Sequence, residues 1–295
     1  MPLFLRRFGL FPLLVVILLS PAGCLHRQSA PVVVVGELHG EIIWAGEVFI
    51  GGDVTLAADA RLTIRPGAVV RFLGPVGFAG GESEHPHFPG SELNIYGVLE
   101  AMGTPAQPIA FAAADDDAPA GSWGAVNFAE GSRGVLRYCV FRQADSAVHS
   151  REATVEVTES WFENNLVGIR FHTSNMRIEN NLLRGNGTGV RFHFGAPVVS
   201  RNRFEENRVN LFITAHPRDY LFEDNRFGRP LEYHVVLGEE VPEDVRLSNN
   251  DWDGAAVDDV TGRIFDGRRS PYLGTVGIEP LRVVPAAEAG PSWIR

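Results

Sequence analysis

Residues 160–180 read SWFENNLVGIRFHTSNMRIEN, and residues 181–201 read NLLRGNGTGVRFHFGAPVVSR. The two segments have the same length, and most apolar, asparagine and glycine positions coincide. Related units start 21, 21, 21, 23 and 25 residues apart, at Cys139, Ser160, Asn181, Asn202, Asn225 and Asn250. The third residue of every unit is large and apolar: Phe141, Phe162, Leu183, Phe204, Phe227 and Trp252. A fixed period of this length is typical of a repeat architecture.

A second set of aligned positions follows within each unit. Val148, Ile169, Val190 and Leu211 align, as do Ser150, Phe171, Phe192 and Ile213. The residues between these two positions are mostly polar, so apolar and polar residues alternate with a period of two. Such alternation predicts β-strands, and glycine and asparagine at fixed offsets predict the turns between them.

A unit of about 21 residues made of short strands cannot bury its own apolar side, whereas stacked units can. The leucine pattern and helical stretch of leucine-rich repeats are missing, so a parallel β-helix is expected. Stacking in register places Asn181, Asn202, Asn225 and Asn250 in one inward column. We expect each side-chain amide there to bond the next one. Cys139 falls in the same column, which predicts a buried thiol.

Other segments resemble a known superfamily. They are residues 52–56 (GDVTL), 62–72 (LTIRPGAVVRF), 93–99 (LNIYGVL), 122–128 (SWGAVNF) and 249–252 (NNDW). Together with the repeat they resemble the right-handed parallel β-helix (pectate-lyase-like) superfamily, specifically its bacterial envelope proteins. The resemblance implies an all-β, single-stranded right-handed parallel β-helix with an irregular N-terminal cap and a C-terminal closing tail. It does not select a function, because this fold carries lyases, hydrolases, epimerases, adhesins and scaffolds.

The sequence divides into four segments. We expect a lipoprotein-type signal peptide over residues 1–24, a tether over 25–30, the β-helix over 31–253, and a C-terminal cap and tail over 254–295. The irregular residues 31–56 would cover the first rung, because the end of an open coil exposes unpaired backbone. The last residues show no clear strand pattern and are expected to be loose.

The first segment is interpreted as a targeting signal. Arg6 and Arg7 precede the apolar run 10–19, which is too short to span a bilayer and fits a secretory signal. The following Pro-Ala-Gly-Cys24 resembles the lipobox of bacterial lipoproteins, although that motif prefers leucine where Pro21 stands. The resemblance implies lipidation of Cys24 and attachment to the outer membrane, facing the periplasm or the cell surface. An ordinary secretory signal is the alternative.

The amino-acid composition excludes several classes of function. The chain has 295 residues and a formal net charge of −10, and all 26 of its basic residues are arginine. The absence of lysine excludes Schiff-base and phosphate-loop lysines. The negative charge argues against a general nucleic-acid partner. Two cysteines cannot form a disulfide framework or a multi-cysteine metal site.

One face of the predicted coil collects cations. If Ile169 and Phe171 point inward, Arg170 and His172 point outward, and the units before and after repeat this arrangement. The resulting candidate site for an anionic glycan contains His149, Arg151, Arg170, His172, Arg191, His193 and Phe212. Arginine suits the recognition of carboxylates, and an exposed Phe212 ring could stack on a sugar. No carboxylate is expected among these outward positions, although acids on loops from other faces could cover them.

A different column alternates in sign. It reads Arg142, Glu163, Arg184 and Glu205. Oppositely charged neighbours in adjacent strands attract weakly, so we interpret this column as structural.

Metal ligands are only weakly indicated. The loop 80–90 contains Glu82, Glu84, His85 and His87, and the loop 113–121 contains Asp115, Asp116 and Asp117. The aspartates could hold calcium but lack the spacing of a dedicated loop. No cofactor is therefore expected, with calcium left possible.

Three functions remain compatible with these patterns. The favoured one is a noncatalytic, envelope-anchored lipoprotein that binds or scaffolds, on an anionic polysaccharide in its more specific form. The alternatives are a lyase, hydrolase or epimerase acting on uronate-containing glycans, and a purely structural surface component. Hydrolases of this fold need two carboxylates on adjacent rungs, and no such pair falls on the cationic face. No catalytic residue is assigned, and the sequence does not indicate an oligomeric state.

Overall fold

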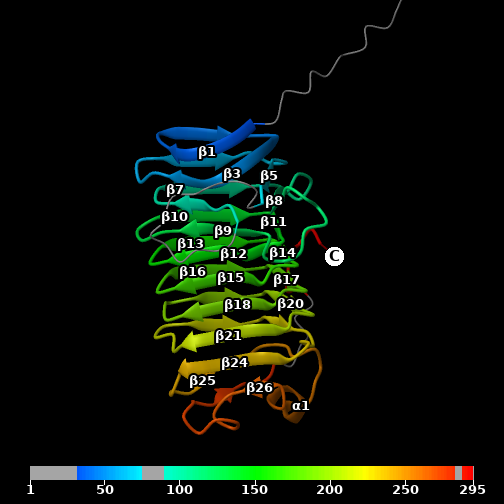
Figure 1. Cartoon of the computed structure of the whole chain (residues 1–295). Helices are drawn as coiled ribbons and strands as arrows, with labels where there is room; N and C mark the ends of the chain where they lie inside the picture. The colour runs from blue at the N-terminus through cyan, green and yellow to red at the C-terminus, as the bar shows by residue number, and fades with distance from the viewer. Residues whose placement is uncertain (1–31, 75–89, 283–287, 295) are drawn as a thin grey trace, which may run out of the picture. The chain divides into compact units, whose positions relative to one another are not determined.

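The computed structural model describes residues 32–74, 90–282 and 288–294. These residues form a right-handed parallel β-helix, in which the chain winds through successive rungs (Figure 1). Every pairing between named strands is parallel, and only one short helix is present among the described residues, α1 (Val257–Thr261). The predicted fold class is therefore confirmed.

Each regular rung contributes one strand to each of three columns. The first column contains the first halves of β1 (Val32–Leu38) and β3 (Glu47–Leu56), then β5 (Val69–Phe72), β8 (Ile109–Ala113), β11 (Cys139–Arg142), β14 (Trp161–Glu163), β17 (Leu182–Arg184), β20 (Arg203–Glu205) and β23 (Arg226–Phe227). The second contains the second halves of β1 and β3, then β6 (Leu93–Ile95), β9 (Trp123–Phe128), β12 (Ala144–Arg151), β15 (Val167–His172), β18 (Thr188–His193), β21 (Val209–Ala215), β24 (Tyr233–Glu240) and β26 (Ile264–Phe265). The third contains β2 (Glu41–Trp44), β4 (Arg61–Ile64), β7 (Val98–Met102), β10 (Arg133–Arg137), β13 (Thr154–Thr158), β16 (Asn175–Glu179), β19 (Val198–Ser200) and β22 (Leu221–Glu223).

The register is the one that the repeat predicts. Ile169 pairs with Val190, and Phe171 pairs with Phe192 in the same strands. Their side chains are buried, whereas the intervening Arg170 is partly exposed. Alternation of buried and partly exposed positions is the expected consequence of the strand's period of two. It fixes which side chains reach the surface.

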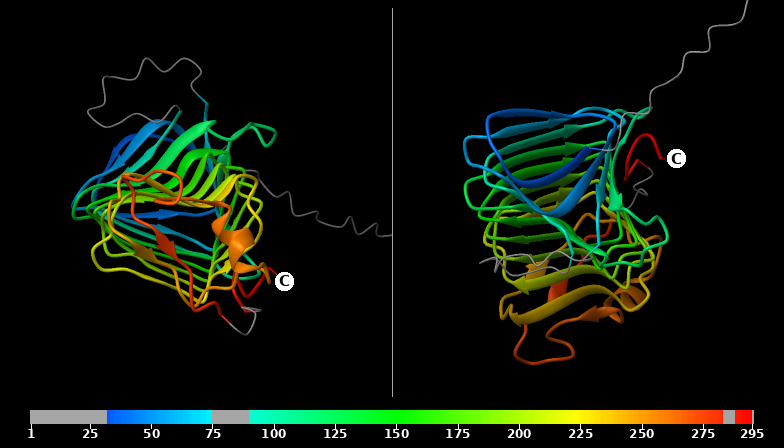
Figure 2. Two further views of the ribbon diagram at one scale, coloured as in Figure 1. Left: turned by 90° about the horizontal axis from the view of Figure 1, so that it is seen from below. Right: turned by 45° about the horizontal axis from the view of Figure 1, so that its top comes forward.

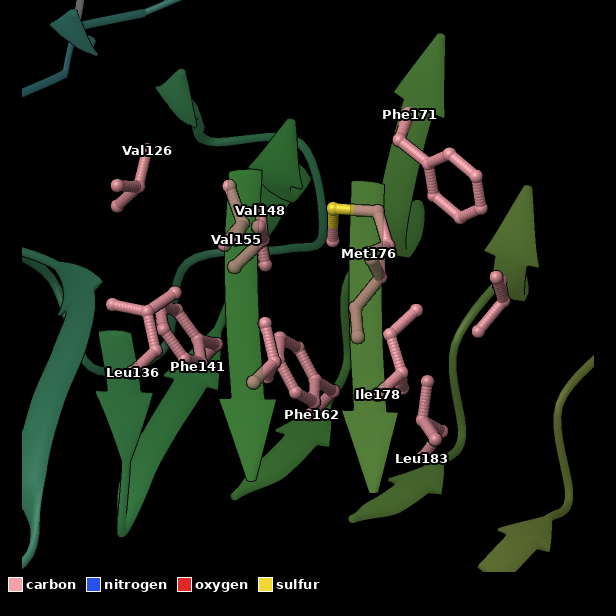
Figure 3. Close-up of a cluster of buried hydrophobic side chains, with 14 of the residues drawn as sticks. Val126, Leu136, Phe141, Val148, Val155, Phe162, Phe171, Met176, Ile178 and Leu183 are labelled. Atoms are coloured by element: carbon pink, nitrogen blue, oxygen red, sulfur yellow. The ribbon is translucent and has the colours of Figure 1, made fainter. Parts of the chain in front are cut away.

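The interior consists of stacked apolar columns. Buried side chains from successive strands meet across the coil (Figure 3). The Phe141 and Phe162 rings stack with centroids 4.7 Å apart, and Phe204 stacks on Phe227 at the same distance. Trp252 closes this column 4.5 Å from Phe227. The rings follow the strand spacing, so each rung buries its neighbour's aromatic face.

The predicted asparagine ladder is present at the corner between the third and first columns. The Asn181 side chain donates to Asn202 Oδ1, and this donation repeats from Asn202 to Asn225 and from Asn225 to Asn250, each at 3.0 Å. The backbone N–H of each rung donates to the same oxygen. Earlier rungs continue the column with Ser160 and the fully buried Cys139. Burial raises the pKa of the Cys139 thiol, so the sulfur is an uncharged core atom.

A second ladder, which the sequence analysis missed, occupies the corner between the first and second columns. Asn165 donates to Asn186 Oδ1 at 2.9 Å, and Asn186 donates to Asn207 Oδ1 at 3.0 Å. The residue before each member, such as Asn164 or Gly185, has a positive φ. A left-handed residue turns the chain sharply, and the next side chain then lies inside the corner.

The two ends of the coil differ. At the start, β1 pairs with β3 alone among the described strands, and Val33 and Val35 on it are more than half exposed. At the other end, α1 and β26 lie across the last rungs, and β25 (Val245–Arg246) pairs with β27 (Val276–Gly277) (Figure 2). The expectation of a closing segment after residue 254 fits this arrangement.

The expectation of a loose terminus is wrong for residues 288–294. The Ser292 N–H donates to Glu159 Oε2 at 2.7 Å, and the Trp293 indole donates to the Glu159 carbonyl at the same distance. Trp293 also packs edge-on against Tyr138. An indole that finds both an aromatic partner and an acceptor can fix a short segment to the side of the coil.

The ladder provides a stability prediction. Replacing Asn202 with alanine should lower the free energy of unfolding by about 3 kcal/mol, because buried donors and acceptors on two neighbouring rungs lose their partner. Asn175→Ala, on the exposed side of β16, is the matched control and should change stability by about 0.5 kcal/mol or less. Urea unfolding followed by circular dichroism measures both. Equal changes in the free energy of unfolding for the two substitutions would contradict a stabilising role of the ladder.

Candidate functional site

The predicted cationic residues lie in two adjacent columns on the second sheet column. His149, Arg170 and Arg191 occupy successive rungs, and Arg151, His172 and His193 do the same two residues further along. We call these six residues the arginine–histidine groove. Arg170 and Arg191 are direct neighbours in register, so two guanidinium groups project from strands about 4.8 Å apart.

The surface is hollowed at these residues. A depression of about 370 Å³ is lined by all six residues of the arginine–histidine groove, and Phe171, Phe192 and Thr214 complete its lining. These lining residues include no aspartate or glutamate. The depression therefore presents cationic and hydrogen-bond-donating groups to a ligand.

Phe212 packs against an arginine of the groove. Its ring continues the column beyond Arg191, as the repeat requires. The Arg191 guanidinium lies 4.9 Å from the ring centroid, a cation–π distance. One face of the ring thus contacts an arginine of the same surface, and stacking of the ring on a sugar stays a prediction.

Two carboxylates from outside the predicted columns reach the rim of the groove, which is the alternative that the sequence left open. Glu152 Oε1 lies 3.5 Å from Arg151 Nε, and Glu240 Oε2 lies 3.7 Å from His193 Nε2. Glu152 follows Arg151 at a corner, and Glu240 arrives from β24, two strands beyond His193 in the stack. Their charges offset the rim cations. Arg191 forms no ion pair with a residue that the structure describes.

Burial and like charge both act on His172 and Arg191. The pKa of His172 is lowered by burial first, then by the neighbouring His193 and Arg151. The His172 and His193 rings stack 4.8 Å apart. The pKa of Arg191 is also lowered, by burial and by Arg170. Since repulsion of this kind destabilises the unliganded protein, an anion in the groove would relieve it.

The structure adds neighbours that the sequence analysis did not identify. Asn94 and Asn127 precede His149 in the same column. His149 Nδ1 lies 2.7 Å from Asn127 Oδ1, and Asn127 Nδ2 donates to Asn94 Oδ1 at 3.0 Å. Since Asn127 donates through its nitrogen, its oxygen accepts and His149 carries a proton on Nδ1.

These amides belong to a second depression of about 520 Å³. It shares His149 and Arg151 with the first one, so the two are contiguous, and Tyr96 and Glu130 also line it. A one-residue irregularity in β12, at Ala147, shifts the spacing between Asn127 and His149 to 22 residues. The 21-residue register therefore could not align them.

The first three members of the alternating charge column, Arg142, Glu163 and Arg184, form the predicted ion pairs. Glu163 accepts from Arg142 at 3.3 Å and from Arg184 at 2.8 Å. Glu205 instead pairs with Arg203 in its own strand, at 2.8 Å. These arginines have carboxylate partners, in contrast to Arg191.

The three aspartates do not converge on a common point. Asp116 pairs with Arg71, and Asp115 accepts from the Asp117 backbone N–H at 3.0 Å. Within residues 32–74, 90–282 and 288–294, no three histidine, cysteine or acidic side chains are grouped to hold a metal ion.

Several predicted features fall outside the described residues. They are Cys24, the signal segment 1–24, the tether 25–30, and Glu82, Glu84, His85 and His87. Among the described residues, no helix combines the length and apolar character needed to cross a membrane.

Comparison with known proteins supports the fold. Residues 121–227 match the sequence model of a family described as the right-handed beta helix region. The match runs from β9 to β23 and includes the whole arginine–histidine groove. No curated protein and no solved structure matches the chain. The central rungs therefore resemble this family, in agreement with the parallel coil of the structure, and such a pectate-lyase-like fold is compatible with binding and with action on carbohydrates.

The lowered pKa of His172 provides a pH prediction. Because the folded-state value lies below the ordinary 6.5, the contribution of His172 to stability is complete above pH 6.5. It is lost as the pH falls through the lowered value. Between pH 7.5 and pH 5, the free energy of unfolding should therefore fall less in the His172→Gln variant than in the wild-type protein.

Urea unfolding at the two pH values measures this difference. His39→Gln is the control, because His39 lies outside the groove beside Glu37 and Asp59. The His39→Gln substitution should not reduce the fall in the free energy of unfolding between pH 7.5 and pH 5. The same acid sensitivity in wild type and His172→Gln would contradict the assigned repulsion.

Proposed function

We propose that the protein is a noncatalytic, envelope-anchored β-helix lipoprotein that binds an anionic polysaccharide in the arginine–histidine groove. The observation that carries the proposal is Arg191, which is partly buried, directly beside Arg170, and without an ion pair among the described residues. A partly buried guanidinium beside a like charge lowers the free energy of unfolding, and a bound polyanion would offset this loss.

The charge pattern supports a polymer with repeated acid groups. Cations recur at every rung, about 4.8 Å apart, along three strands. Arginine donates two hydrogen bonds to one carboxylate, which suits uronate-type units. The contiguous amide-lined depression around Asn94 and Asn127 offers hydrogen bonds to neutral hydroxyl groups of the same chain.

A noncatalytic role is favoured by the distribution of acids. Glycoside hydrolysis needs a pair of carboxylates on either side of the scissile bond, about 5 to 10 Å apart. The residues that line the depression of 370 Å³ include none, and the rim acids Glu152 and Glu240 are placed beside Arg151 and His193. The groove therefore has donors for binding and lacks the acid pair for hydrolysis.

Binding to polygalacturonate tests the groove. Arg170→Gln and Arg191→Gln should each weaken binding about tenfold, the effect of losing a charge-assisted hydrogen bond. Arg184→Gln is the matched control, because it removes the same charge from a different column. Titration calorimetry with the acidic polymer, and with a neutral glucan, measures these affinities. Equal weakening by all three substitutions would contradict a specific groove.

The same incubation tests the enzymatic alternative. A lyase would release unsaturated products that absorb in the ultraviolet, with or without added calcium. The proposal expects no steady product formation. If the wild-type protein forms such products and the His172→Ala variant does not, the protein is a polysaccharide lyase and the noncatalytic proposal is wrong.

The anchor rests on the first residues of the sequence. The apolar run 10–19 followed by Ala22-Gly23-Cys24 supports lipidation of Cys24 and attachment to the outer membrane. Metabolic labelling with radioactive palmitate should label wild type and leave Cys24→Ser unlabelled. Secretion of an unlabelled wild-type protein would indicate an ordinary signal peptide.

A further inference from the structure

A second pocket lies at the C-terminal end of the coil, away from the arginine–histidine groove. Its volume is about 340 Å³, and its lining comes from β24, α1 and the turns that flank them. The lining residues are Arg229, His234, Trp252, Asp253, Ala255, Asp259 and Arg263. None of them belongs to the groove described above.

His234 occupies a position that glycine fills in earlier rungs. The column runs from Gly168 and Gly189 through Asn210 to His234. A Cβ atom on Gly168 or Gly189 would lie 2.7 Å from the carbonyl of the next rung. At the last rungs this restriction is lifted, and a buried imidazole is accommodated with 4% of its surface exposed.

The second asparagine ladder ends on this imidazole. Asn207 Nδ2 donates to Asn210 Oδ1 at 3.1 Å, and Asn210 Nδ2 lies 3.4 Å from His234 Nδ1. Since the Asn210 nitrogen donates, His234 Nδ1 accepts, and the proton of the neutral ring is on Nε2. Burial and Arg263 lower the pKa of His234 to about 4, so the ring is neutral at pH 7.

Within the described part of the chain, the ladder ends at His234 without a further acceptor. The side-chain amides of Asn165, Asn186 and Asn207 each donate one hydrogen bond to the next ladder member and a second to a carbonyl of the preceding rung. The Nε2–H of His234 has no acceptor among the described residues.

Other donors around the pocket also lack partners within the described part of the chain. The Trp252 indole N–H is buried without an acceptor, and its ring meets His234 edge-on at 5.1 Å. Arg229 and Arg263 form no ion pair with a described residue. Of the two acids, Asp253 pairs with Arg226 at 2.6 Å, and Asp259 is exposed on α1. With Asp253 paired to Arg226, the lining keeps two arginines, Arg229 and Arg263, against one acid, Asp259.

The geometry points to a binding site for an oxyanion, a carboxylate, phosphate or sulfate group, held by His234 Nε2–H together with Arg229 and Arg263. Such a group accepts several charge-assisted hydrogen bonds at once and would satisfy donors that have no partner among the described residues. The site is independent of the proposed polysaccharide binding.

Nuclear magnetic resonance of the mature chain with ¹⁵N-labelled histidine tests the site. Phosphate, sulfate and acetate are titrated separately at pH 7, with chloride at equal ionic strength as the reference. At least one of the three anions should shift the His234 Nε2 resonance in a saturable manner and raise the pKa of His234. The anion that does so identifies the class of ligand.

Substitutions locate the binding. Arg229→Gln and Arg263→Gln should each weaken it about tenfold, as expected for the loss of one charge-assisted hydrogen bond. Arg208→Gln, whose arginine pairs with Glu232 at 3.1 Å outside the pocket, and Arg191→Gln in the groove should leave it unchanged. Absence of a saturable shift with all three anions, or equal weakening by Arg208→Gln, would overturn the proposal.

Discussion

Stacking of each rung in register on the previous one is the constraint on which the rest of the structure depends. The parallel backbone hydrogen bonds allow such stacking, but they do not by themselves fix which residue lies above which. The two asparagine ladders add that selectivity. Asn202, for example, bonds both the backbone and the side chain of neighbouring rungs, and a slip of one residue would break all of these bonds. The aromatic columns beside the ladders would lose their contacts in the same slip.

Stacking in register also explains why the surface can concentrate one chemistry. A position that repeats on successive rungs forms a column, so a preference for arginine at one position becomes a row of cations. Where the column alternates in sign, as at Arg142 and Glu163, the result is stabilising. Where it does not, as at Arg170 and Arg191, the repulsion is retained in the folded state. A surface that keeps such repulsion is better explained by a ligand than by stability.

The fold could be predicted from the sequence because its signals are repeated. The 21-residue period, the Phe162 and Phe204 positions and the asparagines at unit starts all indicate the same coil, and the structure confirms them. The members of the cationic site could also be named in advance, since their columns follow from the period alone.

Features that interrupt the period could not be predicted. The irregularity at Ala147 hid the alignment of Asn127 with His149. Glu152 and Glu240 reach the groove from a corner and from two strands further along, where side-chain reach decides the contact. The attachment of Trp293 to Glu159 joins residues that no periodic pattern relates. Contacts of this kind depend on the geometry of the folded chain.

We propose that stacking in register assembles arginines that are distant in the sequence into one extended site for a polyanion. It is tested most directly by titrating the mature protein with oligogalacturonates of increasing length, from the single sugar acid upward. If the cations act as one array along the coil, the affinity should rise with each added acid unit until the oligomer spans the groove, and then level off. The same affinity for the single acid as for the longest oligomer, or for a neutral oligomer of equal length, would contradict the claim.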